Sequence, residues 1–294
     1  MAASFFRLLA RLPLPLLHLL GAGAGWLVWF ASAGHRRRMR ENLALALGRT
    51  DPRVLRAAIV ETGRQLLELP FVWLRPQVEV LACVRRVEGV ALLERAQADG
   101  ASVLLLTPHL GCFEILGQYL CTRWRFTALY RPPRQAALRP SMEAGRAREN
   151  FRVAPADLSG VRSLVRALRS GEMVIVLPDQ VPKKGEGVWM PFFGRPAWTM
   201  TLAARLSQIE GVRTVMMWAE RLPRGEGYVL RFTEPVEPLS GSVEARCATI
   251  NREIERLILA CPQQYMWSYD RYRRRSGVPA PETAEAAART TRQA

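Results

Sequence analysis

Short apolar runs alternate with amphipathic helical patterns along most of this 294-residue chain, and this alternation restricts the fold more than any other feature. Strands that alternate with helices form a sheet whose neighbouring strands run mainly parallel. The sequence therefore predicts an α/β fold, with a mainly parallel central sheet flanked by helices. The expected strands are 83–89, 101–108, 126–132, 173–179, 212–220 and 227–236, and the expected helices are 53–72, 90–100, 112–123, 136–150, 161–171, 198–211 and 242–262.

An apolar segment near the N-terminus points to a membrane. Residues 12–34 contain no charged side chain apart from His18 when it is protonated, and they are about long enough to cross a bilayer as a helix. Two tryptophans lie near the end of the segment, and the basic cluster HRRRMR follows at 35–40. Aromatic anchoring and retained positive charge predict a membrane anchor at 1–34, with the rest of the chain in the cytoplasm.

The anchor has two other interpretations. A cleaved signal peptide is disfavoured, because the basic cluster follows the apolar run instead of preceding it. A half-inserted amphipathic helix remains open beside a spanning helix. After the anchor we expect one cytoplasmic domain at 35–275, followed by a disordered tail at 276–294 that has few bulky apolar residues.

The net charge indicates which partners the protein can attract, and the cysteines indicate whether it has disulfides or a zinc site. The formal net charge of +16 favours anionic partners, namely nucleic acid, phospholipid headgroups or acidic proteins. The five cysteines are an odd number without C-x-x-C spacing, which indicates neither a disulfide framework nor a zinc site. We expect free thiols in a reducing compartment, no metal and a monomeric chain.

The segment TPHLGCFE (107–114) places His109 directly after an expected buried strand and Glu114 five residues later. Side chains at the carboxyl ends of strands commonly form the sites of open α/β sheets. Such a histidine can take a proton from a hydroxyl at neutral pH, while a carboxylate orients its ring and stabilises the imidazolium. A capping or core histidine bonded to a helix-terminal carboxylate is the alternative interpretation.

Three more segments complete an ordered set with TPHLGCFE. They are LYRPPRQAALRPSMEAGRAREN (129–150), LPDQVPKKGEGVWMPFFGRPAWTMTLAARL (177–206) and QQYMWSYDRYRRR (263–275). Together the four segments resemble those of the bacterial lipid A biosynthesis acyltransferases, the late lauroyl and myristoyl transferases, within the glycerolipid acyltransferase superfamily. The resemblance runs from the N-terminal apolar segment to RYRRR and leaves out only the tail.

The resemblance implies an O-acyltransferase that moves a fatty acyl chain of the C12–C14 class from acyl carrier protein to a hydroxyl of a lipid A precursor, at the cytoplasmic face of the inner membrane. Acyl carrier protein is then a co-substrate, and no cofactor is implied. His109 matches the catalytic histidine of the family and Glu114 its acidic partner. Glycerol-phosphate members have aspartate at the second position and a proline-glutamate-glycine-threonine block where this chain has LPDQ, so a glycerol-phosphate acceptor is not expected.

Other residues of these motifs are candidates for substrate binding. Arg131 could donate to the oxyanion of a tetrahedral intermediate, or could hold a substrate phosphate with two hydrogen bonds. Asp179 and Gln180 lie at the end of the strand that begins at Met173, so in a parallel sheet they should face the same edge as His109 and orient Arg131 or the acceptor sugar. The alternative is that Asp179 caps a turn.

The stretch 187–200 joins apolar aromatic residues to a glycine turn and an expected helix that begins near Thr199. It could form a wall for the acyl chain beside a helix N-terminus that binds an anion, with Arg195 assisting. Its aromatic residues could equally belong to the ordinary core.

The expected partners are acyl carrier protein, a lipid A precursor and membrane lipid. Eight arginines between Arg123 and Arg152, against two glutamates, would attract acidic or phosphorylated substrates. A related enzyme with another acceptor, such as an aminolipid or a mannosylated phosphoinositide, is one alternative. A catalytically inactive membrane scaffold is another. A basic nucleic-acid-binding protein is disfavoured, since neither a recognition helix nor an aromatic stacking sheet is evident.

Overall fold

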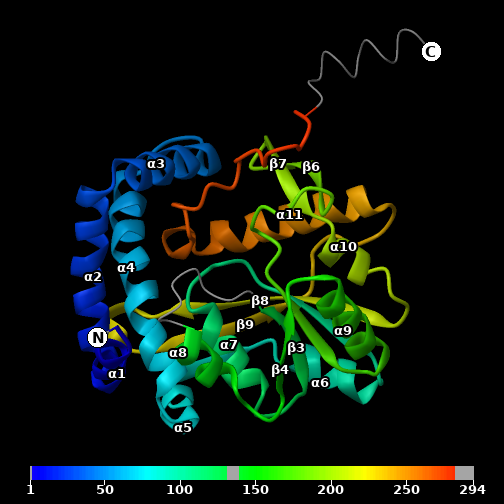
Figure 1. Cartoon of the computed structure of the whole chain (residues 1–294), viewed down its shortest axis with the longest axis horizontal. Helices are drawn as coiled ribbons and strands as arrows, with labels where there is room; N and C mark the ends of the chain where they lie inside the picture. The colour runs from blue at the N-terminus through cyan, green and yellow to red at the C-terminus, as the bar shows by residue number, and fades with distance from the viewer. Residues whose placement is uncertain (1, 131–138, 282–294) are drawn as a thin grey trace.

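A seven-stranded sheet forms the centre of the computed structural model, which describes residues 2–130 and 139–281 (Figure 1). The strand order is β1-β9-β8-β2-β5-β3-β4, and every neighbouring pair is parallel except β8 and β9. This confirms the predicted α/β fold with a mainly parallel sheet. The strands are β1 (Val84–Glu88), β2 (Ser102–Leu106), β3 (Phe126–Tyr130), β4 (Phe151–Pro155), β5 (Met173–Val176), β8 (Val212–Arg221) and β9 (Tyr228–Thr233).

Helices cover both faces of the sheet, because its central strands are apolar on both sides. All five residues of β2 are buried: Leu104 and Leu106 belong to one core, and Val103 and Leu105 to the other. Such continuous apolar strands are typical of a parallel sheet covered on both faces. The helices are α1 (Ala2–Arg11), α2 (Leu14–Ala31), α3 (Ala33–Leu47), α4 (Pro52–Leu74), α5 (Gln77–Leu81), α6 (Ala91–Ala98), α7 (Phe113–Leu120), α8 (Arg139–Arg146), α9 (Leu158–Arg169), α10 (Leu202–Leu206) and α11 (Val243–Ala260).

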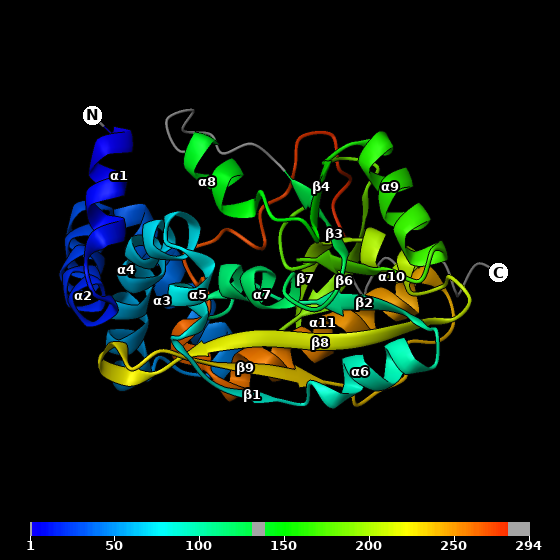
Figure 2. The same ribbon diagram turned by 90° about the horizontal axis from the view of Figure 1, so that it is seen from below.

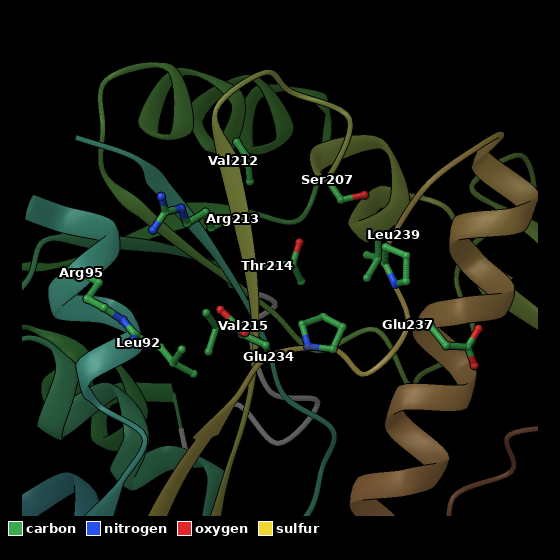
Figure 3. Close-up of a pocket in the computed structure, with 12 residues that line it drawn as sticks. Leu92, Arg95, Ser207, Val212, Arg213, Thr214, Val215, Glu234, Glu237 and Leu239 are labelled. Carbon is green, nitrogen blue, oxygen red and sulfur yellow. The ribbon is translucent and has the colours of Figure 1, made fainter. Parts of the chain in front are cut away.

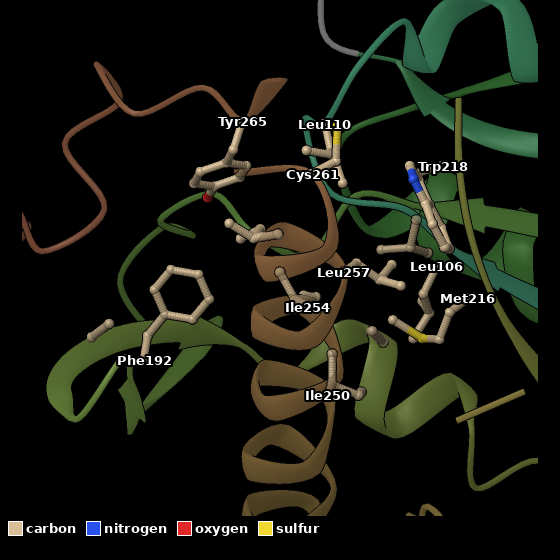
Figure 4. Close-up of a cluster of buried hydrophobic side chains, with 14 of the residues drawn as sticks. Leu106, Leu110, Phe192, Met216, Trp218, Ile250, Ile254, Leu257, Cys261 and Tyr265 are labelled. Atoms are coloured by element: carbon tan, nitrogen blue, oxygen red, sulfur yellow. The ribbon is translucent and has the colours of Figure 1, made fainter. Parts of the chain in front are cut away.

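Each face of the sheet has its own set of helices. The core that includes Leu104 takes its helical side chains mainly from α9, α10 and α11 and from the first half of α4. The core that includes Leu105 takes them mainly from α6, α7 and the last turns of α4. Figure 4 shows the inner face of α11, where Ile250, Ile254 and Leu257 lie between the sheet and the side chain of Phe192.

A separate hairpin occupies the stretch 187–200. Strands β6 (Gly187–Phe192) and β7 (Arg195–Met200) pair antiparallel, with Trp189 opposite Trp198. The helix expected near Thr199 begins instead at Leu202, because residues 195–200 complete the hairpin. The hairpin closes the core on the side of α11.

The packed body continues past residue 275. Val278 is buried against Val181 and Trp198, and the indole N–H of Trp189 donates to the carbonyl of Pro279 at 2.9 Å. The first residues of the predicted tail therefore lie against the hairpin, while residues 282–294 are outside the described residues.

Helix α2 is long and apolar enough to cross a membrane, by length and composition. It lies against α4 at one end of the molecule (Figures 1 and 2). The two backbones approach closely through glycines: a Cβ atom on Gly63 would lie 1.9 Å from the carbonyl oxygen of Gly21 and 2.4 Å from the nitrogen of Gly25. Gly21 and Gly25 of the GAGAG segment thus serve helix packing, as small residues do where helices pack closely.

Replacing Gly63 with alanine is expected to destabilise the protein by about 1–3 kcal/mol, because the added methyl group forces α2 away from α4. The melting temperature in detergent, followed by circular dichroism, measures the effect. Gly23→Ala is the matched control, since a Cβ atom there meets nothing within 4 Å and alanine favours a helix by about 0.5–1 kcal/mol. Equal melting temperatures for the two variants would contradict the close packing.

A buried cluster of charges joins this helical pair to the sheet. The Arg221 guanidinium donates to Glu68 at 2.5 and 2.8 Å and to Glu61 at 2.5 Å. His18 Nε2 lies 3.3 Å from Glu68, and the Tyr228 hydroxyl donates to the same carboxylate at 3.0 Å. Burial opposes the ionisation of Glu68, but the charge and hydrogen bonds of Arg221 outweigh it and lower the pKa of Glu68 to about 2. Helices α2 and α4 are therefore fixed to the end of β8.

Candidate active site

His109 and Asp179 meet at the carboxyl edge of the sheet. His109 follows β2 and Asp179 follows β5, and these two strands are parallel neighbours. The Asp179 carboxylate is 2.7 Å from His109 Nδ1 and accepts the His109 backbone N–H at 2.9 Å. The expectation that Asp179 faces the same edge as His109 is thus met, although its carboxylate contacts the histidine directly.

The hydrogen bonds of His109 define its tautomer. An ionised carboxylate only accepts, so Nδ1 carries a proton and donates a hydrogen bond to Asp179. The side-chain amide nitrogen of Gln180 lies 3.1 Å from Nε2, which then accepts an N–H. The lone pair of Nε2 is therefore directed at the Gln180 amide, and 15% of the His109 side chain is exposed. Nε2 is the basic atom of the site.

Asp179 is suited to stabilise a positive charge on the ring. Burial of its carboxyl opposes ionisation, but the electrostatic interaction with His109 and the two hydrogen bonds from that residue outweigh burial and lower the pKa of Asp179. Asp179 is thus an anion in a buried position, where its attraction for an imidazolium is less screened than at the surface.

The C-terminal motif holds the loop that carries His109. The backbone N–H of Met266 donates to the His109 carbonyl at 3.3 Å, and the Gly111 N–H donates to the Gln264 carbonyl at 3.1 Å. Gly111 has φ +60°, and a Cβ atom there would lie 1.9 Å from the carbonyl oxygen of Ala219. The edge of the Phe113 ring contacts the imidazole at a centroid distance of 4.9 Å. The ring of His109 is therefore placed by three separate segments.

Glu114 lies in the first turn of α7, and its carboxylate is directed elsewhere. It accepts the Trp73 indole N–H at 3.0 Å and two hydrogen bonds from the Arg146 guanidinium, at 2.5 and 3.4 Å. Burial opposes the charge on Arg146, but the Glu114 carboxylate outweighs it and raises the pKa of Arg146. Among the described residues, the hydrogen-bonded carboxylate beside His109 is that of Asp179 and not that of Glu114.

The remaining predicted site residues are Arg131 and Arg195. Arg131 lies outside the described residues. Arg195 begins β7, and its guanidinium is 4.7 Å from the centroid of the Tyr272 ring. Within the described ranges no contact joins Arg195 to His109, and no group of three or more His, Cys, Asp and Glu side chains could hold a metal ion.

Sequence reasoning missed two features of this site. Arg146 lies within the motif 129–150, but nothing in its spacing indicates that it pairs with Glu114. The role of residues 264–266 in holding the loop of His109 depends on backbone contacts, which leave no pattern in side-chain types. The only signal in the sequence is that Arg146 and residues 264–266 lie within the ordered motifs 129–150 and 263–275.

A hollow of about 630 Å³ lies elsewhere on the molecule (Figure 3). It is lined from α6, the first half of β8 and the segment after β9, including Arg95, Arg213 and Glu237. Its lining does not include His109, Asp179 or Gln180, so we do not assign it to the candidate active site.

Comparisons with known proteins agree with the geometry. The family model for the bacterial lipid A biosynthesis acyltransferases matches residues 1–274. The lipid A biosynthesis lauroyltransferase of Escherichia coli K12 is 27% identical over 92% of this chain and 90% of its own length. The palmitoleoyltransferase of the same strain is 27% identical over 90% and 87%. A lipid A biosynthesis acyltransferase of Haemophilus influenzae is 25% identical over 96% and 92%. This chain therefore belongs to the bacterial lipid A biosynthesis acyltransferase family.

Proposed function

We propose that this acyltransferase uses His109 as the general base that activates a hydroxyl of the lipid A precursor, and that the acyl donor is a thioester of acyl carrier protein. The observation that supports this most directly is the imidazole arrangement, with Nδ1–H on the buried Asp179 carboxylate and the Nε2 lone pair directed at the Gln180 amide, in a side chain that is partly exposed. General-base catalysis by a positioned histidine contributes about 10²–10⁴-fold to a rate.

In the proposed reaction a single atom, Nε2 of His109, first accepts a proton and later returns it. Nε2 takes the hydroxyl proton as the acceptor oxygen attacks the thioester carbonyl, and a tetrahedral oxyanion forms. The C–S bond then breaks, the ester remains on the acceptor, and the imidazolium returns its proton to the leaving thiolate. Asp179 stabilises the imidazolium in between. We propose that Arg131 donates to the oxyanion or holds a substrate phosphate.

Gln180 contacts the catalytic nitrogen, whereas Arg195 lies on the β6–β7 hairpin. The amide of Gln180 occupies Nε2 at 3.1 Å, so the acceptor hydroxyl must displace it before a proton can move. We therefore propose that Gln180 turns toward the acceptor when the acceptor binds. Arg195, on the hairpin, would meet an anionic group of a substrate that extends across β6 and β7.

The donor assignment is supported by charge. Acyl carrier protein is acidic, and a chain with a net charge of +16 attracts an acidic protein over a distance. We propose an acyl chain of the C12–C14 class. Two relatives of equal identity are named for a lauroyl and a palmitoleoyl group, so the identity of the relatives does not select the chain length. The proposed location is the inner membrane, with the active site facing the cytoplasm.

Asp179→Asn is expected to lower kcat by about a hundredfold or more, with little change in KM, because the imidazolium loses its anionic partner. For the same reason the acid limb of the kcat/KM profile should move to lower pH. Acyl-transfer kinetics between pH 5 and 9 measure both effects.

The variant Glu114→Gln tests whether Glu114, the partner predicted from the sequence, or Asp179, the partner seen in the structure, acts on His109. It removes the charge that holds Arg146, so it should change stability and KM while the acid limb of the profile keeps its position. If Glu114→Gln moves the acid limb and Asp179→Asn does not, then Glu114 is the carboxylate that acts on His109 during the reaction.

The acceptor is tested in the cell. A strain that lacks this gene should accumulate lipid A that is short of one acyl chain, and the wild-type gene should restore that chain. Mass spectrometry of the extracted lipid A measures the difference. Normal lipid A together with an under-acylated aminolipid or phosphoinositide mannoside would assign the enzyme to the other acceptor.

A further inference from the structure

Helices α1 and α2 expose large apolar side chains on the outside of the molecule, which together we call the outer face. On α2 the exposed side chains recur every three or four residues, while those at the complementary positions are buried. Leu27 is 72% exposed and Phe30 is 71% exposed. The exposed large apolar residues of this outer face are Phe5, Leu8, Leu16, Leu19, Leu20, Leu27, Val28 and Phe30.

The opposite face of α2 is not suited to lipid. His18 is 1% exposed and contacts Glu68, and Arg64 donates from Nε to the His18 carbonyl at 3.4 Å. Gly21 and Gly25 lie directly on the α4 backbone. Half of the α2 surface therefore belongs to the protein interior, and its polar contacts would be lost if lipid surrounded the helix.

Helix α4 prevents α2 from crossing a membrane by itself. The two helices lie side by side, and α4 carries charged side chains along its length, among them Arg53, Arg56 and Arg64. Its Glu61 and Glu68 are fixed to Arg221 of β8. A bilayer that enclosed α2 from end to end would also enclose these charges, at a cost of about 2.5–3.5 kcal/mol for each charge that reached its centre.

We propose that this outer face of α1 and α2 lies flat in one leaflet of an anionic phospholipid bilayer and does not span it. The apolar side chains enter the hydrocarbon edge, as in interfacial amphipathic helices. Basic side chains flank the face where headgroups would lie. Arg7 and Arg11 line a hollow of about 390 Å³ at one end, and Arg37 and Arg40 are exposed at the other. The active site and the membrane-bound acceptor are thereby kept on one side of the bilayer.

The topology test uses cysteines at the two ends of α2. Cys83 is first replaced with serine, because the other four cysteines are buried. Arg7→Cys and Arg37→Cys are then made separately in full-length protein expressed in a Gram-negative host. With a membrane-impermeant maleimide, both positions should be protected in intact spheroplasts and labelled after permeabilisation. Labelling of Arg7→Cys from the outside, with Arg37→Cys protected, would show a spanning helix and overturn the proposal.

The binding test uses vesicles of phosphatidylethanolamine and phosphatidylglycerol. Leu27→Glu with Phe30→Glu should lower the vesicle-bound fraction of purified protein at flotation by at least about tenfold, because two exposed apolar side chains that would enter the lipid become charged. Leu158→Glu is the matched control, since Leu158 is 73% exposed on α9 and lies away from this face. Unchanged binding of the double variant, with an unchanged melting temperature, would refute the proposal whether or not the enzyme transfers acyl groups to lipid A.

Discussion

Replacing His109 with alanine is expected to lower acyl transfer by at least about a hundredfold, because no other group in the described site can take the hydroxyl proton. Asp179 is ionised but buried behind the imidazole, and Gln180 has no basic atom. The measurement is the transfer of radiolabelled acyl groups from acyl carrier protein to a tetra-acylated lipid A precursor.

Two controls separate chemistry from folding. His35→Ala removes a partly exposed histidine of α3 and should leave the rate unchanged within about twofold. The melting temperature of His109→Ala shows whether the loop has kept its place. A folded His109→Ala protein that transfers acyl groups at the wild-type rate would show that His109 has a structural role only.

Arg221→Met is expected to destabilise the protein by about 3–5 kcal/mol, which is the largest stability effect that we predict. Arg221 is 3% exposed and pairs with both Glu61 and Glu68, so its removal leaves the buried Glu68 without its arginine partner and leaves Glu61 with Arg64 alone. The loss should appear as a lower melting temperature in detergent, and because the cluster joins α2 to β8, proteolysis near the N-terminus should become faster.

An exposed arginine provides the comparison. Arg213 pairs with Asp99 at 2.7 Å, but both side chains are at least half exposed, so Arg213→Met should change the stability by less than about 1 kcal/mol. The same free-energy cost for both substitutions would contradict the buried cluster.

The stability of the wild-type protein in acid gives a second measurement of this cluster. Since the pKa of Glu68 is lowered from 4.5 to about 2, its contribution is complete above pH 4.5 and is lost as the pH falls toward 2.

Most of the sheet could be predicted from the sequence, since its central strands are short runs of buried apolar residues. The runs around 101–108 and 173–179 contain β2 and β5. Strand β4 was not predicted, because it lies at the sheet edge and most of its side chains are exposed or half-exposed, so it lacks an apolar pattern. The hairpin at 187–200 was interpreted as an aromatic stretch and a helix start, because apolar residues pack equally well in either.

The sequence predicts the positions of some site residues but not the contacts of others. The position of His109 follows from the strand before it, and the position of Asp179 follows from the parallel order of β2 and β5. Contacts between distant segments do not follow from local spacing. The proximity of Glu114 to His109 in sequence suggested a pair, but the first turn of α7 directs Glu114 to Trp73 and Arg146 on other helices.

Our proposal that this protein transfers an acyl chain from acyl carrier protein to a lipid A precursor is tested most directly with the purified full-length enzyme. The enzyme is incubated with acyl carrier proteins that carry C10 to C16 chains and with a tetra-acylated precursor that bears its inner sugars. We predict one added acyl group, with the highest rate for a donor of the C12–C14 class. Absence of transfer from every donor, by an enzyme shown to be folded, would contradict the claim.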